Sequence, residues 1–161
     1  MILWPAGMAL LAVWLVFRDP AVDHRMVVAG AVVPDAVDAP FGGARVLHTV
    51  VAAAVVLVVV MLATRGHRHA RRRWIFLPIG ILLHLAFDGM WTETHTFRWP
   101  AFGWSLGAPL PALDHGLGVL VAEEVAGAVA LAWFWRRFHL GDPAVRATFW
   151  RTGRLPRDLV G

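Results

Sequence analysis

Aspartate and histidine side chains interrupt the apolar stretches of this sequence at helical spacing. Asp35 and Asp38 are three residues apart, and His84 and Asp88 are four apart, so each pair lies on one face of a helix. His48 stands near the beginning of another apolar stretch. Imidazole and carboxylate groups together bind Zn²⁺, Mn²⁺ or Fe²⁺, and Mg²⁺ where oxygen ligands dominate. These residues are therefore candidates for a metal site.

Such a site supports hydrolysis. A metal ion lowers the pKa of a bound water towards about 7, and the hydroxide attacks an ester or phosphoester. A carboxylate that is not a ligand can act as general base. We assign the catalytic candidates as Glu123, which lies two turns into a later apolar stretch, and Asp38.

Each candidate also has an ordinary structural interpretation. His84 and Asp88 could form a hydrogen-bonding pair between helices, and Asp35 could be a helix-terminal residue because it follows Pro34. His48 could be an interfacial histidine without a role in chemistry. The weaker candidates are His24, His95, Asp114, His115 and Glu124, together with His67 and His69 of an arginine-rich segment.

The elements that position these residues are long apolar runs. Of the 161 residues 58% are hydrophobic and the mean hydropathy is +0.61, whereas a soluble domain is about 45–50% apolar. A bilayer crossing needs about 20 helical residues. The runs that we expect to be spans are 2–17, 26–39, 46–63, 74–91 and 117–135. The sequence thus predicts an all-α fold, a polytopic transmembrane helical bundle with about four or five spans.

We expect one transmembrane domain over residues 1–138 and a basic tail over 139–161, with a short interfacial helix around 144–150. Arginine gathers in the 65–73 segment, which we expect to be a loop, and in the tail, and such segments stay cytoplasmic. This places the chain in the inner (plasma) membrane with its N-terminus outside and its C-terminus cytoplasmic. The candidate ligands then converge in the outer half of the bilayer.

Composition excludes several other classes of function. The chain has no cysteine, which rules out a disulfide, a thiolate metal site and a cysteine nucleophile. The net charge is +4, but the basic residues do not form a stripe that alternates with exposed aromatic residues. We therefore expect no nucleic-acid partner. Residues 1–4 lack the charged region and cleavage site of a signal peptide, so we expect the first run to be retained.

Four motifs in order resemble the bacterial membrane-bound metal-dependent hydrolase family, of the LexA-regulated inner-membrane type. That family has a Pro-Asp-x-Asp segment, a Thr-His-Ser segment opening a long helix, a His-x-x-x-Asp helix and a later Trp-Pro. Similar segments here are 34–38, 47–49, 84–88 and 99–100, within about residues 26–105.

The resemblance implies that Asp35, His48, His84 and Asp88 are metal ligands, with Asp38 a less secure one. The chain departs from the family pattern at three points. The second Asp comes one residue late, no His follows it, and Arg45 stands near the place of an earlier family His. Residues after 105 lie outside the resemblance.

Two functions follow as expectations. The first is a membrane-embedded metal-dependent hydrolase, with Zn²⁺ favoured over Mn²⁺, Fe²⁺ or Mg²⁺, acting on an ester or phosphoester of a lipid or lipid-linked substrate near the extracytoplasmic face. Its partners would be membrane lipids. The alternative is a non-catalytic membrane protein, either ion- or proton-handling or a structural, partner-binding subunit, that uses the same polar cluster. The inner half of each run is almost wholly apolar, which disfavours a continuous ion path.

Overall fold

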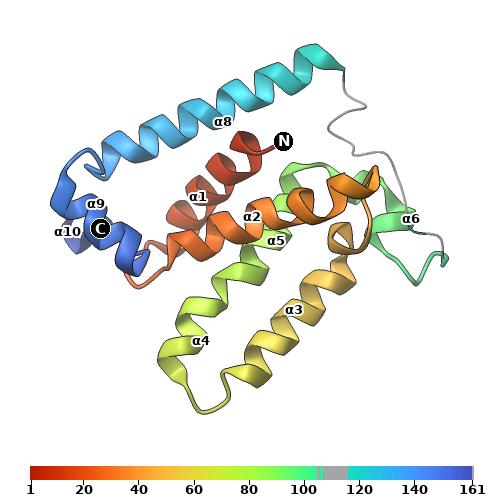
Figure 1. Ribbon diagram of the computed structural model, residues 1–161, viewed down its shortest axis with the longest axis horizontal. Helices are drawn as coiled ribbons and strands as arrows, with labels where there is room; N and C mark the ends of the chain where they lie inside the picture. The colour runs from red at the N-terminus through yellow and green to blue at the C-terminus, as the bar shows by residue number, and fades with distance from the viewer. Residues whose placement is uncertain (105, 107–115, 161) are drawn as a thin grey trace.

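Helices make up the fold of this computed structural model, which describes residues 1–104, 106 and 116–160; among these residues no strand is found (Figure 1). The α-helices are α1 (Leu3–Phe17), α2 (His24–Asp38), α3 (Val50–Ala63), α4 (Arg68–Trp74), α5 (Phe76–Phe87), α6 (Thr94–Phe97), α8 (Leu117–Arg137), α9 (Pro143–Thr152) and α10 (Arg157–Val160). Short 3₁₀ turns are η1 (Ala39–Phe41), η2 (Val46–His48) and η3 (Met90–Thr92). The predicted all-α class is confirmed.

The pairing of α2 with α5 forms the centre of the molecule (Figure 1). Gly30 and Gly80 face each other at this crossing, and a Cβ on Gly30 would lie 2.9 Å from the Gly80 Cα. A Cβ on Gly80 would in turn collide with the Val27 carbonyl oxygen. The two helices can approach this closely because glycine has no Cβ, and the approach brings the ends of α2 and α5 together.

Helix α8 packs along α1, and Gly7 and Gly127 make a similar close approach. The carboxylate of Glu124 on α8 accepts hydrogen bonds from the backbone N–H groups of Ile2, at 2.9 Å, and Leu3, at 3.2 Å. These N–H groups have no partner within α1, because the first turn of a helix leaves its donors free. Glu124 therefore caps α1 from another helix.

The helix boundaries differ from the predicted runs at several places: α2 starts at His24 instead of residue 26, and the run predicted over 74–91 is helical in α5 only to Phe87. The run predicted from residue 46 begins as the turn η2, and α3 starts at Val50 because Thr49 caps it, accepting from the Ala52 N–H at 3.0 Å. The arginine-rich segment was expected to be a loop, but residues from Arg68 onward form α4, separated from α5 by Ile75. Arginine has high helix propensity, so this segment continues as helix into the apolar run.

In the described residues, α8 is the one helix that is both long and apolar enough for a bilayer. Helices α1 and α3 are apolar but have 15 and 14 residues, or roughly 22 Å at 1.5 Å per residue, against a hydrocarbon core of about 30 Å. The coarse expectation of an apolar helical fold holds, while the number of spans stays a prediction.

Apolar side chains cover much of the outer surface of α3 and α8. The most exposed include Val58 at 54%, Leu62 at 64%, Val125 at 57% and Val129 at 63%. Soluble monomers rarely expose large contiguous apolar patches. These two helix faces therefore suit an apolar surrounding or a partner.

Candidate metal site

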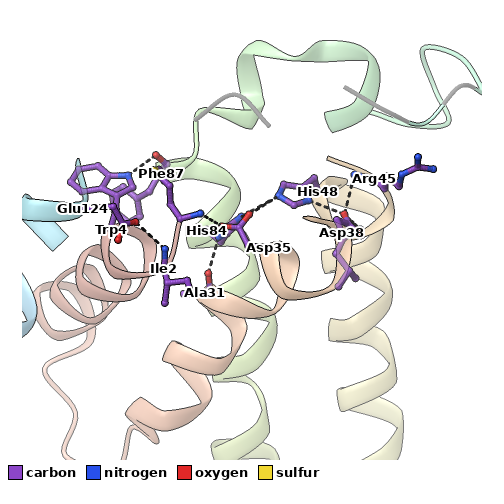
Figure 2. Close-up of polar contacts among 12 residues, drawn as sticks. Ile2, Trp4, Ala31, Asp35, Asp38, Arg45, His48, His84, Phe87 and Glu124 are labelled. Atoms are coloured by element: carbon purple, nitrogen blue, oxygen red, sulfur yellow. Dashed lines mark hydrogen bonds and ion pairs between the residues drawn. The ribbon is translucent and has the colours of Figure 1, made fainter. Parts of the chain in front are cut away.

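Three buried side chains from three segments meet where α2 ends (Figure 2). Asp35 lies in the last turn of α2, His48 ends η2, and His84 lies in the last turn of α5. Both imidazoles are fully buried and Asp35 is 7% exposed. The sequence predicted that these residues converge, and they do.

The ligand atoms of this trio form a small triangle. Asp35 Oδ1 lies 3.4 Å from His48 Nε2 and 3.6 Å from His84 Nε2, and the two Nε2 atoms are 3.3 Å apart. The trio can hold a metal ion, because each residue offers one ligand atom within 4.8 Å of the other two.

A backbone carbonyl fixes the tautomer of His84. Its Nδ1 lies 2.7 Å from the carbonyl oxygen of Ala31 on α2. A carbonyl can only accept a hydrogen bond, so Nδ1 must carry the proton. In the neutral ring the lone pair is then on Nε2, the atom directed at Asp35 and His48. This is the usual arrangement for a metal-binding histidine.

Asp38 orients His48 in a similar way. Asp38 Oδ2 accepts a hydrogen bond from His48 Nδ1 at 2.8 Å and from the backbone N–H groups of Arg45 and Leu47, both at 3.0 Å. The carboxylate thereby fastens the segment between α2 and α3 and turns Nε2 of His48 inward. Figure 2 shows Asp38 on the side of His48 away from Asp35. This geometry supports a positioning role; the predicted catalytic role of Asp38 stays a prediction.

The ligand atoms of the trio repel one another unless a proton or a metal ion lies between them. With both Nδ1 atoms protonated, two imidazole lone pairs and a carboxylate oxygen face one another at 3.3–3.6 Å in a buried space. Either a proton on one imidazole or a metal ion removes that repulsion. The other carboxylate oxygen, Asp35 Oδ2, is bound by the ammonium group of Met1 at 2.9 Å, which leaves Oδ1 to face the histidines.

Two carboxylates outside the trio have buried oxygens without hydrogen-bond partners among the described residues. Asp88, the C-cap of α5, is 5% exposed, and its Oδ2 has no partner in the described structure. Glu123 on α8 has a buried Oε2 that likewise has no hydrogen-bond partner in the described structure. Buried polar atoms of this kind mark a place for an ion or water.

Asp88 and Glu123 do not join the close group within the described residues. The predicted roles of Asp88 as a ligand and of Glu123 as a catalytic base therefore stay predictions. Asp114 and His115 lie outside the described residues.

The weaker candidates have other environments. Glu124 caps α1, the exposed His95 donates through Nδ1 to the Phe102 carbonyl at 3.0 Å, and His24 lies at the opposite end of α2. Sequence reasoning missed the Ala31 carbonyl and the capping role of Glu124. A backbone acceptor carries no side-chain signal, whereas Glu124 could have been found as an acid placed to meet a helix N-terminus.

Comparison of the chain with protein-family models, with curated proteins and with solved structures found no match. The geometry of the site is therefore the basis for the functional argument below.

Proposed function

We propose that this chain is a membrane-embedded, metal-dependent hydrolase whose metal is held by Asp35, His48 and His84. The observation that carries the proposal is the convergence of three buried ligand atoms, within 4.8 Å of one another, from three segments. Each imidazole has its Nδ1 engaged by an acceptor, which directs Nε2 at the shared point. Burying this set without a cation is costly.

The distances favour Zn²⁺ among the candidate metals. Zn–N bonds of about 2.0–2.1 Å and Zn–O bonds of about 2.0–2.2 Å at tetrahedral angles separate neighbouring ligands by roughly 3.3–3.5 Å. The three measured separations are 3.3, 3.4 and 3.6 Å. An octahedral Mg²⁺ site, with bonds of about 2.0–2.1 Å, brings adjacent ligands to roughly 2.9 Å. Three protein ligands also match the pattern of catalytic zinc sites, which keep a fourth position open.

The remaining carboxylates suit hydrolysis. A bound zinc ion supplies Lewis acidity, which lowers the pKa of water towards about 7. Asp88 and Glu123 each have a buried carboxylate oxygen with no hydrogen-bond partner among the described residues, and such a group can accept a proton from water as general base. Asp38 holds His48 in the ligating orientation.

A lipid environment is supported by the surface and by the charges. Helix α8 is long and apolar enough to cross a bilayer, and the outward faces of α3 and α8 are apolar. Most of the arginines lie in residues 65–73 and 136–157, and Figure 1 shows α4 and the C-terminal helices of these segments away from the C-terminal end of α2. With these arginines cytoplasmic, the trio lies towards the outer face. A lipid or lipid-linked ester or phosphoester is the substrate that reaches such a site.

Metal content tests the proposal directly. Full-length protein purified from zinc-supplemented cells should carry about one zinc per chain by elemental analysis. We expect His84→Ala and His48→Ala to lose the metal, since each removes one of three ligands. The matched control is His95→Ala, because this histidine is exposed and bonded to a loop carbonyl. A metal-free wild-type protein, or full metal retention in His84→Ala, would contradict the assignment.

Activity requires a second experiment. The zinc-loaded protein in detergent should release product from a panel of lipid esters and phosphoesters. Removal of the metal by a chelator should abolish the turnover, and added zinc should restore it. Turnover that survives chelation and the His84→Ala change would refute metal-dependent catalysis at this site.

One observation favours a non-catalytic alternative. The 3.3 Å separation of the two Nε2 atoms also fits a hydrogen bond with a single shared proton. In that case the trio would link α2, η2 and α5 without chemistry. The same elemental analysis distinguishes the two, because a proton-bridged trio binds no zinc.

A further inference from the structure

A strongly basic pocket lies at the other end of α2 from the metal site, and residues at the start of α2, on α4 and at the end of α9 line it. Its volume is about 300 Å³. The charged side chains that line it are Arg25, Arg72, Arg73, Arg151, Arg154 and Asp23, and His69 adds an imidazole. Five guanidinium groups thus face one space together with a single carboxylate.

The carboxylate of Asp23 holds two of the pocket arginines in place. The side chain is buried, and its Oδ2 pairs with Arg25 Nη2 at 2.8 Å and with Arg73 Nε at 3.0 Å. Gly153 lies directly against the carboxylate at a φ of 72°, and a Cβ there would collide with Asp23 Oδ1. Two arginines from distant parts of the chain are therefore held at one point.

Hydrogen bonds also attach the end of α9 to the start of α2. Arg25 Nη1 donates to the Trp150 carbonyl at 2.6 Å. His24 donates through Nδ1 to the Gly153 carbonyl at 3.1 Å. The pocket is built by tertiary contacts and is more than a run of basic residues.

The other three pocket arginines have no ion-pair partner among the residues that the structure describes. In the part of the chain that the structure describes, the guanidinium groups of Arg72, Arg151 and Arg154 make no hydrogen bond or ion pair. Like charges brought together destabilise a fold unless an anion joins them. Guanidinium groups bind phosphate through paired hydrogen bonds.

We propose that this pocket binds a phosphate group. Arg72 and Arg154 also line an adjoining hollow of about 630 Å³, whose other walls include the charged residues Asp19 and Arg157 and the apolar Leu155 and Pro156. The hollow offers room and apolar contact for whatever is attached to the phosphate. The phosphate could belong to an anionic lipid headgroup or to a free phosphate ion. This proposal is independent of the metal and of hydrolysis, and only the lipid source rests on the proposed membrane location.

The test compares two double variants with the same loss of charge. Arg72→Gln with Arg154→Gln removes two unpaired pocket arginines. Arg65→Gln with Arg68→Gln removes two exposed arginines of the same basic region that do not line the pocket. Binding to the full-length protein in neutral detergent is titrated with three probes: inorganic phosphate, short-chain phosphatidylglycerol and short-chain phosphatidylcholine. Circular dichroism and melting confirm that both variants are folded.

We expect the pocket variant to lose about ten-fold or more in affinity, as two charge-assisted bonds are removed, while the control variant changes less than about two-fold. Binding of phosphatidylglycerol alone would assign a lipid phosphodiester, and competition by inorganic phosphate would assign a free anion. Equal losses in both variants, or an unchanged pocket variant, would overturn the proposal. Metal content is unaffected by these changes, so failure here leaves the hydrolase proposal to its own test.

Discussion

A single oxygen of Asp38 receives three hydrogen bonds, from the His48 ring and from two backbone N–H groups. This carboxylate fixes both the tautomer of a proposed metal ligand and the path of the chain before α3. Partners of this kind raise the basicity of the ligand and hold its ring in place. Asp38 is thus expected to control metal affinity without touching the metal.

Asp38→Asn tests this role at the scale of one residue. The amide keeps the shape of the side chain but removes its charge, so we expect zinc affinity to fall about 10- to 100-fold while some binding persists. Competition with a chelating dye measures the affinity. Asp19→Asn, at an exposed turn, is the control. If Asp38 were instead the general base, the Asn variant would lose turnover with its zinc affinity unchanged.

The sequence predicted the convergence of polar residues that stand within apolar runs. Asp35, His48 and His84 stand in apolar runs, where polar groups are retained for a reason, and the structure brings all three together. The Ala31 carbonyl that sets the tautomer of His84 could not be predicted, because every residue has a carbonyl. Only the crossing of α2 and α5 selects this one.

The crossing of α2 and α5 is the element-scale feature on which the site depends. Gly80→Ala places a methyl group against the Val27 carbonyl of α2. We expect α2 and α5 to separate, with a loss of stability of about 1–3 kcal/mol and a loss of zinc although no ligand is changed. Melting in detergent and elemental analysis measure the two effects.

Gly118→Ala is the matched control for the crossing. Gly118 also lies in a helix, but a Cβ there meets nothing within 4 Å, and alanine favours helix over glycine by about 1 kcal/mol. This variant should keep its zinc and melt no lower than the wild type. Equal behaviour of the two variants would mean that the close approach of α2 and α5 does not position the site.

Helix boundaries show which local signals can be read in advance. The C-terminal helix expected around 144–150 is found as α9, whose start at Pro143 is capped by Asp142 accepting from Ala144 and Val145 N–H groups. The start of α3 was placed four residues too early, because Val46 and Leu47 are as apolar as the helix that follows. Asp38 draws the Arg45 and Leu47 N–H groups away from a helical path, a tertiary effect that periodicity does not contain.

At the scale of the whole molecule, the membrane proposal depends on an asymmetry along α2. The acid and imidazole groups gather at its C-terminal end, and the arginine pocket gathers at its N-terminal end. Apolar helix faces lie between the two ends. The sequence predicted this separation and the bounds of α1 to within one residue, but not the start of α3, because η2 and the Thr49 cap delay that helix to Val50.

Cysteine labelling tests this arrangement, since the natural chain has no cysteine to react. Thr94→Cys lies on the side of the metal site and His67→Cys lies before α4, and both positions are exposed. If the arginine-rich end is cytoplasmic, a membrane-impermeant maleimide added to intact bacterial cells should label position 94 strongly and position 67 only after the membrane is permeabilised. Labelling of 67 alone would reverse the orientation and move the metal site to the cytoplasmic face. Equal labelling of both sites in a soluble fraction would remove the bilayer from the proposal, and the apolar faces of α3 and α8 would then require a protein partner to cover them.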